Sequence, residues 1–157
     1  MSGLQTVQLA VAEIERYSAT LIAEIESLSE DQLWSREGGI PNSVGTLTLH
    51  LTGNLNHYFG AEILKNGYVR KRDLEFSETD IPKAIVIADL QAAVKIARQA
   101  VDALDEARAD QPYTAADGEK IESLALHLVR MSTHFVHHCG QADFAKFSVV
   151  PKRPGAA

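Results

Sequence analysis

Residues 124–145 read LALHLVRMSTHFVHHCGQADFA, and this stretch decides the fold class. Seven of its residues recur at steps of three and four, a period that places them on one face of an α-helix. This face comprises Leu124, Leu128, Met131, Phe135, His138, Ala142 and Ala145. Four of the six histidines of the chain also lie in this stretch, within twelve residues. One amphipathic helix therefore contributes both to a core and to an unusual cluster of imidazoles.

Three earlier segments show the same helical period. The first covers residues 4–28, and a short helix capped by Ser29 follows it. The second begins at Asn42 or Ser43, since either side chain can cap the first turn of a helix. It ends at Asn66-Gly67, because glycine readily adopts the left-handed conformation of a helix stop.

The connection that follows is long. Residues 69–80 are charged and aperiodic, which predicts a crossover loop. The third helix begins near Pro82 with Asp80 as its cap and ends at Gln111-Pro112, and the fourth begins around residues 117–119. The chain shows no strand pattern. We therefore expect an all-α fold, a four-helix bundle with a long connection that lets helices two and three run parallel.

Composition and charge narrow the class of protein. The 157 residues fit one domain, which we expect over residues 1–150, with a loose tail over 151–157. A net charge of −6 argues against nonspecific nucleic-acid binding, which needs a basic face. The chain has no run of 18 apolar residues and no signal-peptide pattern, so we expect no membrane contact. Because the single cysteine, Cys139, cannot form an internal disulfide, we expect a cytoplasmic protein.

Polar residues form a stripe beside the apolar face of two helices. The second helix carries His50, Asn54 and His57, and the fourth carries His127, Met131, His134, His138 and Gln141. Burying several imidazoles without partners is costly. A metal ion or a hydrogen-bonded pocket would remove that cost.

The pair His134 and His138 has the i, i+4 spacing that stacks two imidazoles on one helix face. His50 from a facing helix could complete a set of three nitrogens that leaves coordination positions open, as in catalytic sites. We expect one divalent ion, zinc or nickel first, although copper and ferrous iron also suit neutral imidazole. His137 is an alternative to His138. No acidic residue lies on the stripe, and Glu62 is the one carboxylate that we keep open as a ligand.

Four further polar residues are candidates for a pocket around this site. They are Asn54, His57, His127 and Gln141. Asn54 lies one turn from His50, and Gln141 lies one turn beyond His138. His57 and His127 would form a second tier if the two helices are antiparallel. For Asn54 and Gln141 the alternative is a hydrogen-bonded residue within the bundle, and for His57 and His127 it is a hydrogen-bonded pair or exposed residues.

Two motifs connect the chain with a known family. The first is NSVGTLTLHLTGNL at residues 42–55, a capped helix start followed by a histidine, and the second is HFVHHCGQ at 134–141. With these motifs the chain resembles the DinB-like family of metal-binding four-helix bundles over about residues 5–148. The resemblance implies an up-down-down-up bundle, often a homodimer, with His50, His134 and His138 as ligands of one divalent ion. It favours His138 over His137.

The resemblance also bears on activity. Some members of that family are transferases or isomerases that use a low-molecular-weight thiol. We therefore expect a metal-dependent hydrolase or a thiol-dependent transferase that acts on a small molecule. Two alternatives stay open: a noncatalytic, stress-associated metal-binding protein, and a dimeric interaction module whose histidines only pack.

Overall fold

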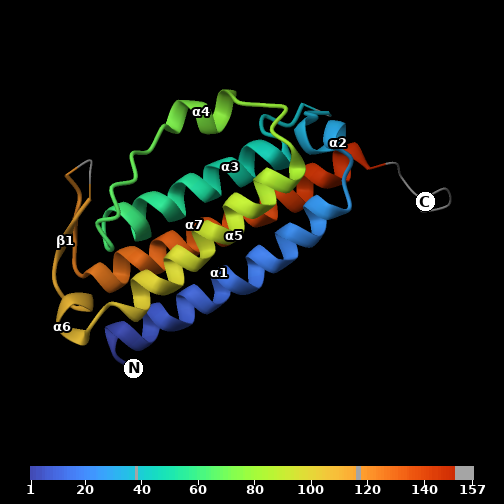
Figure 1. Cartoon of the computed structure of the whole chain (residues 1–157). Coiled ribbons are helices and arrows are strands. Elements are labelled where there is room, and N and C mark those ends of the chain that lie inside the picture. Colours follow the sequence, from blue (N-terminus) through green and yellow to red (C-terminus); the bar gives the residue numbers. More distant parts are fainter. Residues whose placement is uncertain (38, 116–117, 151–157) are drawn as a thin grey trace.

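The structure is a computed structural model that describes residues 1–37, 39–115 and 118–150. Its four long helices lie side by side (Figure 1), and the all-α class is confirmed. They are α1 (Gly3–Glu26), α3 (Val44–Leu55), α5 (Lys83–Asp102) and α7 (Leu124–Val149). The shorter elements are α2 (Glu30–Trp34), the π-helix η1 (Asn56–Ala61), α4 (Arg72–Ser77), α6 (Glu106–Ala109), β1 (Tyr113–Thr114) and β2 (Lys120–Ile121). Helix α1 packs against α5 and α7, and α3 packs against the same two helices.

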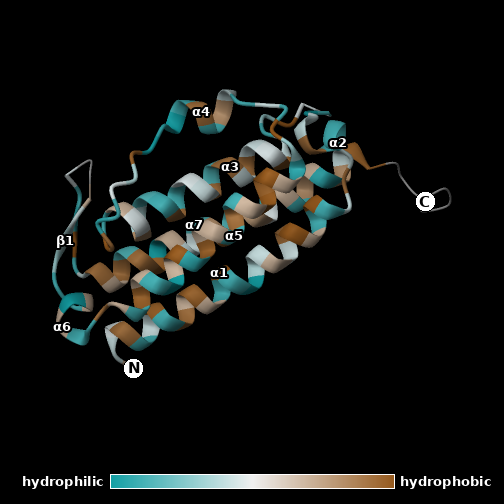
Figure 2. Ribbon diagram, viewed as in Figure 1, coloured by the Kyte–Doolittle hydropathy of each residue, from teal (hydrophilic) through white to brown (hydrophobic). Residues whose placement is uncertain are grey.

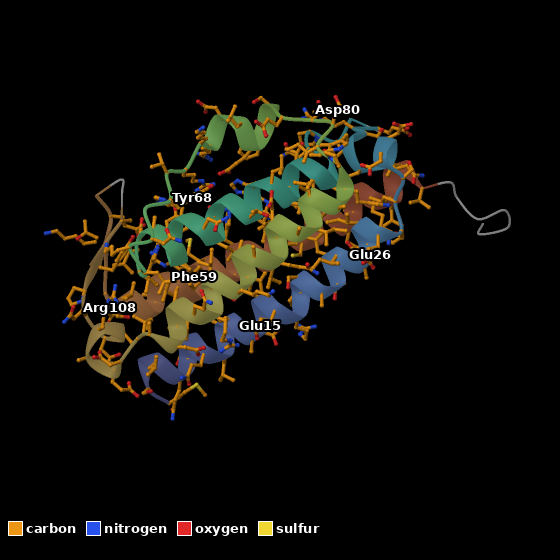
Figure 3. The ribbon with its side chains drawn as sticks, in the orientation of Figure 1. Glu15, Glu26, Phe59, Tyr68, Asp80 and Arg108 are labelled. Atoms are coloured by element: carbon orange, nitrogen blue, oxygen red, sulfur yellow. The ribbon has the colours of Figure 1, made fainter. Side chains whose placement is uncertain are left out.

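The apolar faces of the long helices form one shared core. Figure 2 shows hydrophobic and hydrophilic residues alternating along α1 and α5, as expected of helices with one buried face. The buried residues of α1 include Val7, Val11, Ile14, Leu21 and Ile25. The largest fully buried side chains are Phe59, which Figure 3 shows among the helices, and Phe135 of α7. Burying one such side chain stabilises the fold by about 1.5–3 kcal/mol.

Capping side chains explain where two of the helices begin. The Ser29 side chain accepts a hydrogen bond from the N–H of Gln32 at 3.1 Å, and Oε1 of Gln32 accepts one from the Ser29 N–H at 2.9 Å, so the expected short helix is confirmed as α2. Ser43, rather than Asn42, caps α3 by accepting from the N–H of Thr46 at 3.1 Å. This cap fixes where α3 begins, and His50, the first histidine of the chain, lies on this helix.

The second expected helix changes its hydrogen bonding after Leu55. Over η1 the turns are wider, and the N–H of Glu62 bonds to the carbonyl of His57 at 3.0 Å. Lys65 and Gly67 then adopt left-handed conformations, with φ of 56° and 82°, and end the helical segment. Apolar spacing predicts a helix here but cannot distinguish a π-helical turn from an α-helical one.

The segment expected to be a loop, residues 69–80, contains α4, which packs along α3 (Figure 1). The prediction that Asp80 caps α5 is wrong. Asp80 adopts a left-handed φ of 64°, and Pro82 occupies the cap position without a side-chain hydrogen bond. The carboxylate of Glu30 accepts from the N–H of Lys83 at 3.0 Å instead, so a residue far away in the sequence supplies the missing acceptor.

The third helix is shorter than expected. It ends at Asp102 rather than at residues 111–112, and α6 and a two-stranded hairpin follow. In the hairpin Tyr113 lies opposite Ile121 in an antiparallel register. Strands of two residues are too short to show a period of two, which is why no strand was expected.

The fourth helix begins at Leu124, later than the expected 117–119, of which Asp117 lies outside the described residues. Ser123 sets this start by accepting from the N–H of Leu126 at 3.1 Å. The tail expected over 151–157 also lies outside the described residues. Among the residues that the structure does describe, no helix combines the length and the apolar character needed to cross a membrane.

Candidate metal centre

Three imidazoles from two helices meet between α3 and α7. His50 lies on α3, and His134 and His138 lie one turn apart on α7. One ring nitrogen of each lies within 4.8 Å of the other two, and Nε2 of His50 is 3.1 Å from Nε2 of His134. His50 is buried, whereas the other two are partly exposed. The structure thus brings together three histidines that could hold one metal ion.

A carboxylate orients the first imidazole. Glu75 of α4 is only 7% exposed, and its Oε2 accepts from Nδ1 of His50 at 2.9 Å. Arg70 donates to both oxygens of the same carboxylate, at 2.6 and 2.7 Å. Burial alone would raise the pKa of Glu75, but the hydrogen bonds from Arg70 and His50 lower it below its ordinary value. Because an ionised carboxylate only accepts, Nδ1 of His50 carries the hydrogen of this bond, and Nε2 is the nitrogen of the ring that could bind a metal.

Sequence reasoning missed both Glu75 and Arg70, since they lie in the segment predicted to be an aperiodic loop. For Glu75, the sequence does contain an indication, which is the glycine at position 53 of α3. A Cβ at Gly53 would overlap Oε1 of Glu75 and would lie 2.6 Å from its Cδ. The glycine therefore leaves the room that the carboxylate occupies, one turn from His50 on the same helix.

The two histidines of α7 are held in the neutral form. Burial, and then the nearby His138 and His50, lower the pKa of His134 to about 4. Burial also lowers the pKa of His138, against the opposing effect of a hydrogen bond to Gln141. Neutral imidazole is the form that binds metals.

Two of the predicted pocket residues contact the histidines directly. The Asn54 amide lies 3.0 Å from Nε2 of His50 and 2.9 Å from Nε2 of His134, and its N–H₂ group can donate to both. Oε1 of Gln141 accepts from Nδ1 of His138 at 2.7 Å, which leaves Nε2 of that ring with its lone pair. The Gln141 amide also bonds to His137 at 3.0 Å, so His137 lies behind the site rather than in the group of three.

An open cavity of about 560 Å³ adjoins the three histidines. It is lined by His50, Asn54, Tyr58, Arg70, Arg72, Phe76, Met131, His134 and His138. Its aromatic and thioether side chains form an apolar wall, and the ring of Phe76 lies 5.0 Å from that of His50. Such a mixture of apolar surface and a few polar groups is typical of small-molecule sites.

His57 and His127 lie in a neighbouring cluster around Tyr58, outside the residues that line the cavity. Their rings make edge contacts with Tyr58 at 4.8 and 5.2 Å, and Tyr113 stacks on His127 at 4.2 Å. Glu62, which was kept open as a ligand, instead accepts from Tyr113 and lies 3.2 Å from Nε2 of His57. Burial lowers the pKa of His127, whose Nε2 has no hydrogen-bond partner among the described residues.

The only cysteine does not belong to the site. Cys139 is 6% exposed and points toward α1, where it lines a small cavity with Tyr17, Leu21 and Glu24. Burial raises the pKa of its thiol to about 12. A thiol that stays protonated at neutral pH is a poor nucleophile, so Cys139 acts as a packing residue.

The donor set fits a divalent ion. His50 and His138 commit their Nδ1 hydrogens to Glu75 and Gln141, so Nε2 is the nitrogen of each ring that could bind a metal, which at His50 would replace the Asn54 hydrogen bond. Nε2 of His134 lies 3.1 Å from Nε2 of His50, and with its hydrogen on Nδ1 the ring of His134 would offer a second lone pair at the same point. The amide of Asn54 supplies partial positive charge there, and a divalent ion would supply far more.

Fold and site together define a helical protein with a three-histidine centre suited to a metal ion. The family model described as MST: Mycothiol-S-transferase matches residues 10–146, so the chain belongs to the mycothiol S-transferase family. This is a DinB-like family, and the resemblance drawn from the two histidine motifs is confirmed. No curated protein matches the chain.

Proposed function

We propose that this protein is a metal-dependent thiol S-transferase whose ion is held by His50, His134 and His138. The observation that carries the proposal is the convergence of three imidazoles at the wall of an open cavity, in a chain of the mycothiol S-transferase family. Zinc or nickel is the proposed ion, because both accept imidazole ligands and can leave positions open for a substrate. Mycothiol is the proposed low-molecular-weight thiol.

Residues of this chain hold the ligands ready before a substrate binds. Glu75 holds the ring of His50 and Gln141 holds that of His138, which fixes both orientations. Asn54 donates between two of the rings and is placed to contact a bound substrate atom. The neighbouring His57 and His127 hold the ring of Tyr58, which forms part of the cavity wall.

A divalent ion in this position supplies one effect: it lowers the pKa of a bound thiol, so that a thiolate is available near neutral pH. In the transfer, the thiol sulfur forms a bond to an electrophilic carbon of the acceptor. The leaving group departs with the electron pair of the bond that breaks, and the thiol proton goes to solvent. Because Cys139 stays protonated and faces away from the cavity, the sulfur must come from a cosubstrate.

The proposal is tested by incubating zinc-loaded protein with mycothiol and chlorodinitrobenzene and following the absorbance of the thioether. We expect the wild type to accelerate thioether formation and His134→Ala to lose the acceleration. His137→Ala, a histidine on the same helix but outside the group of three, is the matched control and should keep it. Acceptor loss without thiol would indicate a hydrolase, and bound zinc without turnover would indicate a noncatalytic metal protein; either result contradicts the proposal.

We also propose the up-down-down-up order for the four long helices. Two contacts at different points along each pair of helical segments support it. They are Arg98–Glu15 and Lys83–Leu28 for α5 with α1 and the residues just after it, Ser132–Ala10 and Val149–Gln32 for α7 with α1 and α2, and His138–His50 and His127–Tyr58 for α7 with α3 and η1. In this order α7 runs parallel to α1, while α3 and α5 run antiparallel to them.

A homodimer and a single domain over residues 1–150 complete the proposal. The last turns of α7 expose Phe144 and Phe147, at 70% and 69%, and Phe144 lines an apolar groove of about 740 Å³. Exposed aromatic residues beside a groove are typical of protein interfaces. Sedimentation of the wild type beside Phe144→Ser tests this: a dimer that the substitution converts to a monomer supports it, and a monomeric wild type contradicts it.

A further inference from the structure

The cavity beside the three histidines has an unusual balance of charge. Among the described residues, none of those that line it is acidic, although the chain as a whole carries a net charge of −6. It has two arginines, Arg70 and Arg72. The three imidazoles add no charge, because the metal-binding form of histidine is neutral. The charges that face the cavity are therefore those of the arginines, of any partner that they have, and of the ion that the histidines would hold.

The two arginines differ in their partners. Arg70 is partly buried and forms a bidentate salt bridge with the carboxylate of Glu75, at 2.6 and 2.7 Å. Arg72, at the first residue of α4, is exposed, and no carboxylate of the described residues pairs with it. Among the described residues that line the cavity, Arg72 is thus the cation without a carboxylate partner, and its guanidinium can bind a ligand.

The positive charges of the site would not be fully compensated by a bound thiolate. The ion contributes two positive charges and Arg72 one, while the pair of Arg70 and Glu75 cancels. A thiolate offsets only one of these three charges. A neutral acceptor would leave two positive charges facing it in a partly desolvated cavity, whereas an anionic acceptor would reduce them and would be drawn in by the field.

We propose that Arg72 binds a carboxylate of the acceptor substrate, so that this transferase selects carboxylate-bearing electrophiles with an apolar body. The planar guanidinium matches a carboxylate with two parallel hydrogen bonds. Phe76, one turn further along α4, and Met131 of α7 line the same cavity and provide contact for an apolar ring. The inference rests on the proposed function for the reaction, and Arg72 acts as a specificity residue rather than a catalytic one.

The test compares two acceptors that differ at one group: chlorodinitrobenzoate, which carries a carboxylate, and its uncharged methyl ester. In both, the thiol sulfur bonds to the ring carbon, chloride leaves with the electron pair of its bond, and the thiol proton goes to buffer. Mycothiol, which has no carboxylate, serves as the thiol, so that any preference reports on the acceptor. We expect wild-type protein to prefer the benzoate, and Arg72→Gln to reduce the ratio of kcat/KM for benzoate over ester about fivefold, through KM.

Lys71→Gln is the matched control. It removes the same charge from the adjacent residue, but Lys71 lines a different cavity, with Leu49, Thr52 and Leu74. The ratio should stay at the wild-type value in this variant. If the ratio falls equally in both variants, the preference comes from the overall charge of the protein and not from Arg72. If the ratio does not fall in Arg72→Gln, Arg72 does not bind the carboxylate. Either result overturns the proposal.

A binding measurement keeps this inference separate from the proposed activity. Metal-free protein is titrated calorimetrically with nitrobenzoate, which lacks the chloride leaving group and cannot react. The affinity should be about fivefold weaker in Arg72→Gln than in Lys71→Gln. If neither acceptor reacts but this difference is present, the proposed function fails and the carboxylate site stands. If the affinities of the two variants are equal, the carboxylate site fails whatever the activity.

Discussion

Replacing Glu75 with glutamine tests how the metal centre is held together. The carboxylate is buried, orients His50 through its Nδ1 and is paired with Arg70. Glutamine keeps the size and one acceptor oxygen but removes the charge. Its single oxygen can serve either His50 or Arg70, and its N–H₂ group would face the other as an unwanted donor. The imidazole then loses the partner that fixes its ring and its tautomer.

The expected magnitude follows from this loss. Partners of metal-bound histidines contribute about tenfold to hundredfold to metal affinity. Because Glu75 is only 7% exposed, water cannot easily replace its hydrogen bond to His50. We therefore expect the Kd for zinc to rise about thirtyfold, or about 2 kcal/mol.

The assay is zinc competition against a chelator of known affinity, with Glu15→Gln as the control. Glu15 also forms a two-pronged pair with an arginine, Arg98, but between α1 and α5 and with both side chains partly exposed. The control should bind zinc as the wild type does. A zinc affinity of Glu75→Gln within threefold of the wild type, or an equal loss in Glu15→Gln, would refute the reasoning.

Three further predictions follow from other parts of the structure. Gly53→Ala places a Cβ against the Glu75 carboxylate and should weaken zinc binding in the same competition assay, with no effect expected if the carboxylate can shift freely. Phe135→Ala empties a fully buried position and should lower the free energy of unfolding in urea by about 3–5 kcal/mol, whereas the exposed Phe147→Ala should change it by less than about 0.5 kcal/mol. Burial lowers the pKa of His127, so the unfolded chain takes up its proton first as the pH falls below about 6.5, and the stability present above that pH is lost. Between about pH 7.5 and 5.5 the free energy of unfolding should therefore fall more in the wild type than in His127→Gln, and equal slopes would contradict this assignment.

The residues that sequence reasoning found are those whose position follows from helical period. His134 and His138 share a helix face at any i, i+4 spacing, and His50 occupies a core position of a helix that faces them. Gln141 and Asn54 contact the histidines for the same reason, since each lies one turn from a histidine, although only Asn54 lines the cavity. Periodicity is a local property, and these contacts follow directly from it.

The residues that were missed depend on contacts between distant parts of the chain. Glu75 lies 25 residues from His50, in a six-residue helix too short for a period to appear. The cap of α5 was assigned to Asp80, but Glu30 supplies it across the fold, at a separation of 53 residues from Lys83. The tertiary packing of α4 on α3 and of α2 beside α5 brings these groups into place, and no pattern within either segment encodes it.

The proposed activity requires a metal ion bound by His50, His134 and His138. Elemental mass spectrometry of protein purified without added metal, wild type beside His134→Ala and His137→Ala, measures this directly. We predict about one zinc or nickel ion per chain in the wild type and in His137→Ala, and none in His134→Ala. No ion in the wild type, even after incubation with zinc or nickel, would contradict the account and would leave the histidines as packing residues of an interaction module.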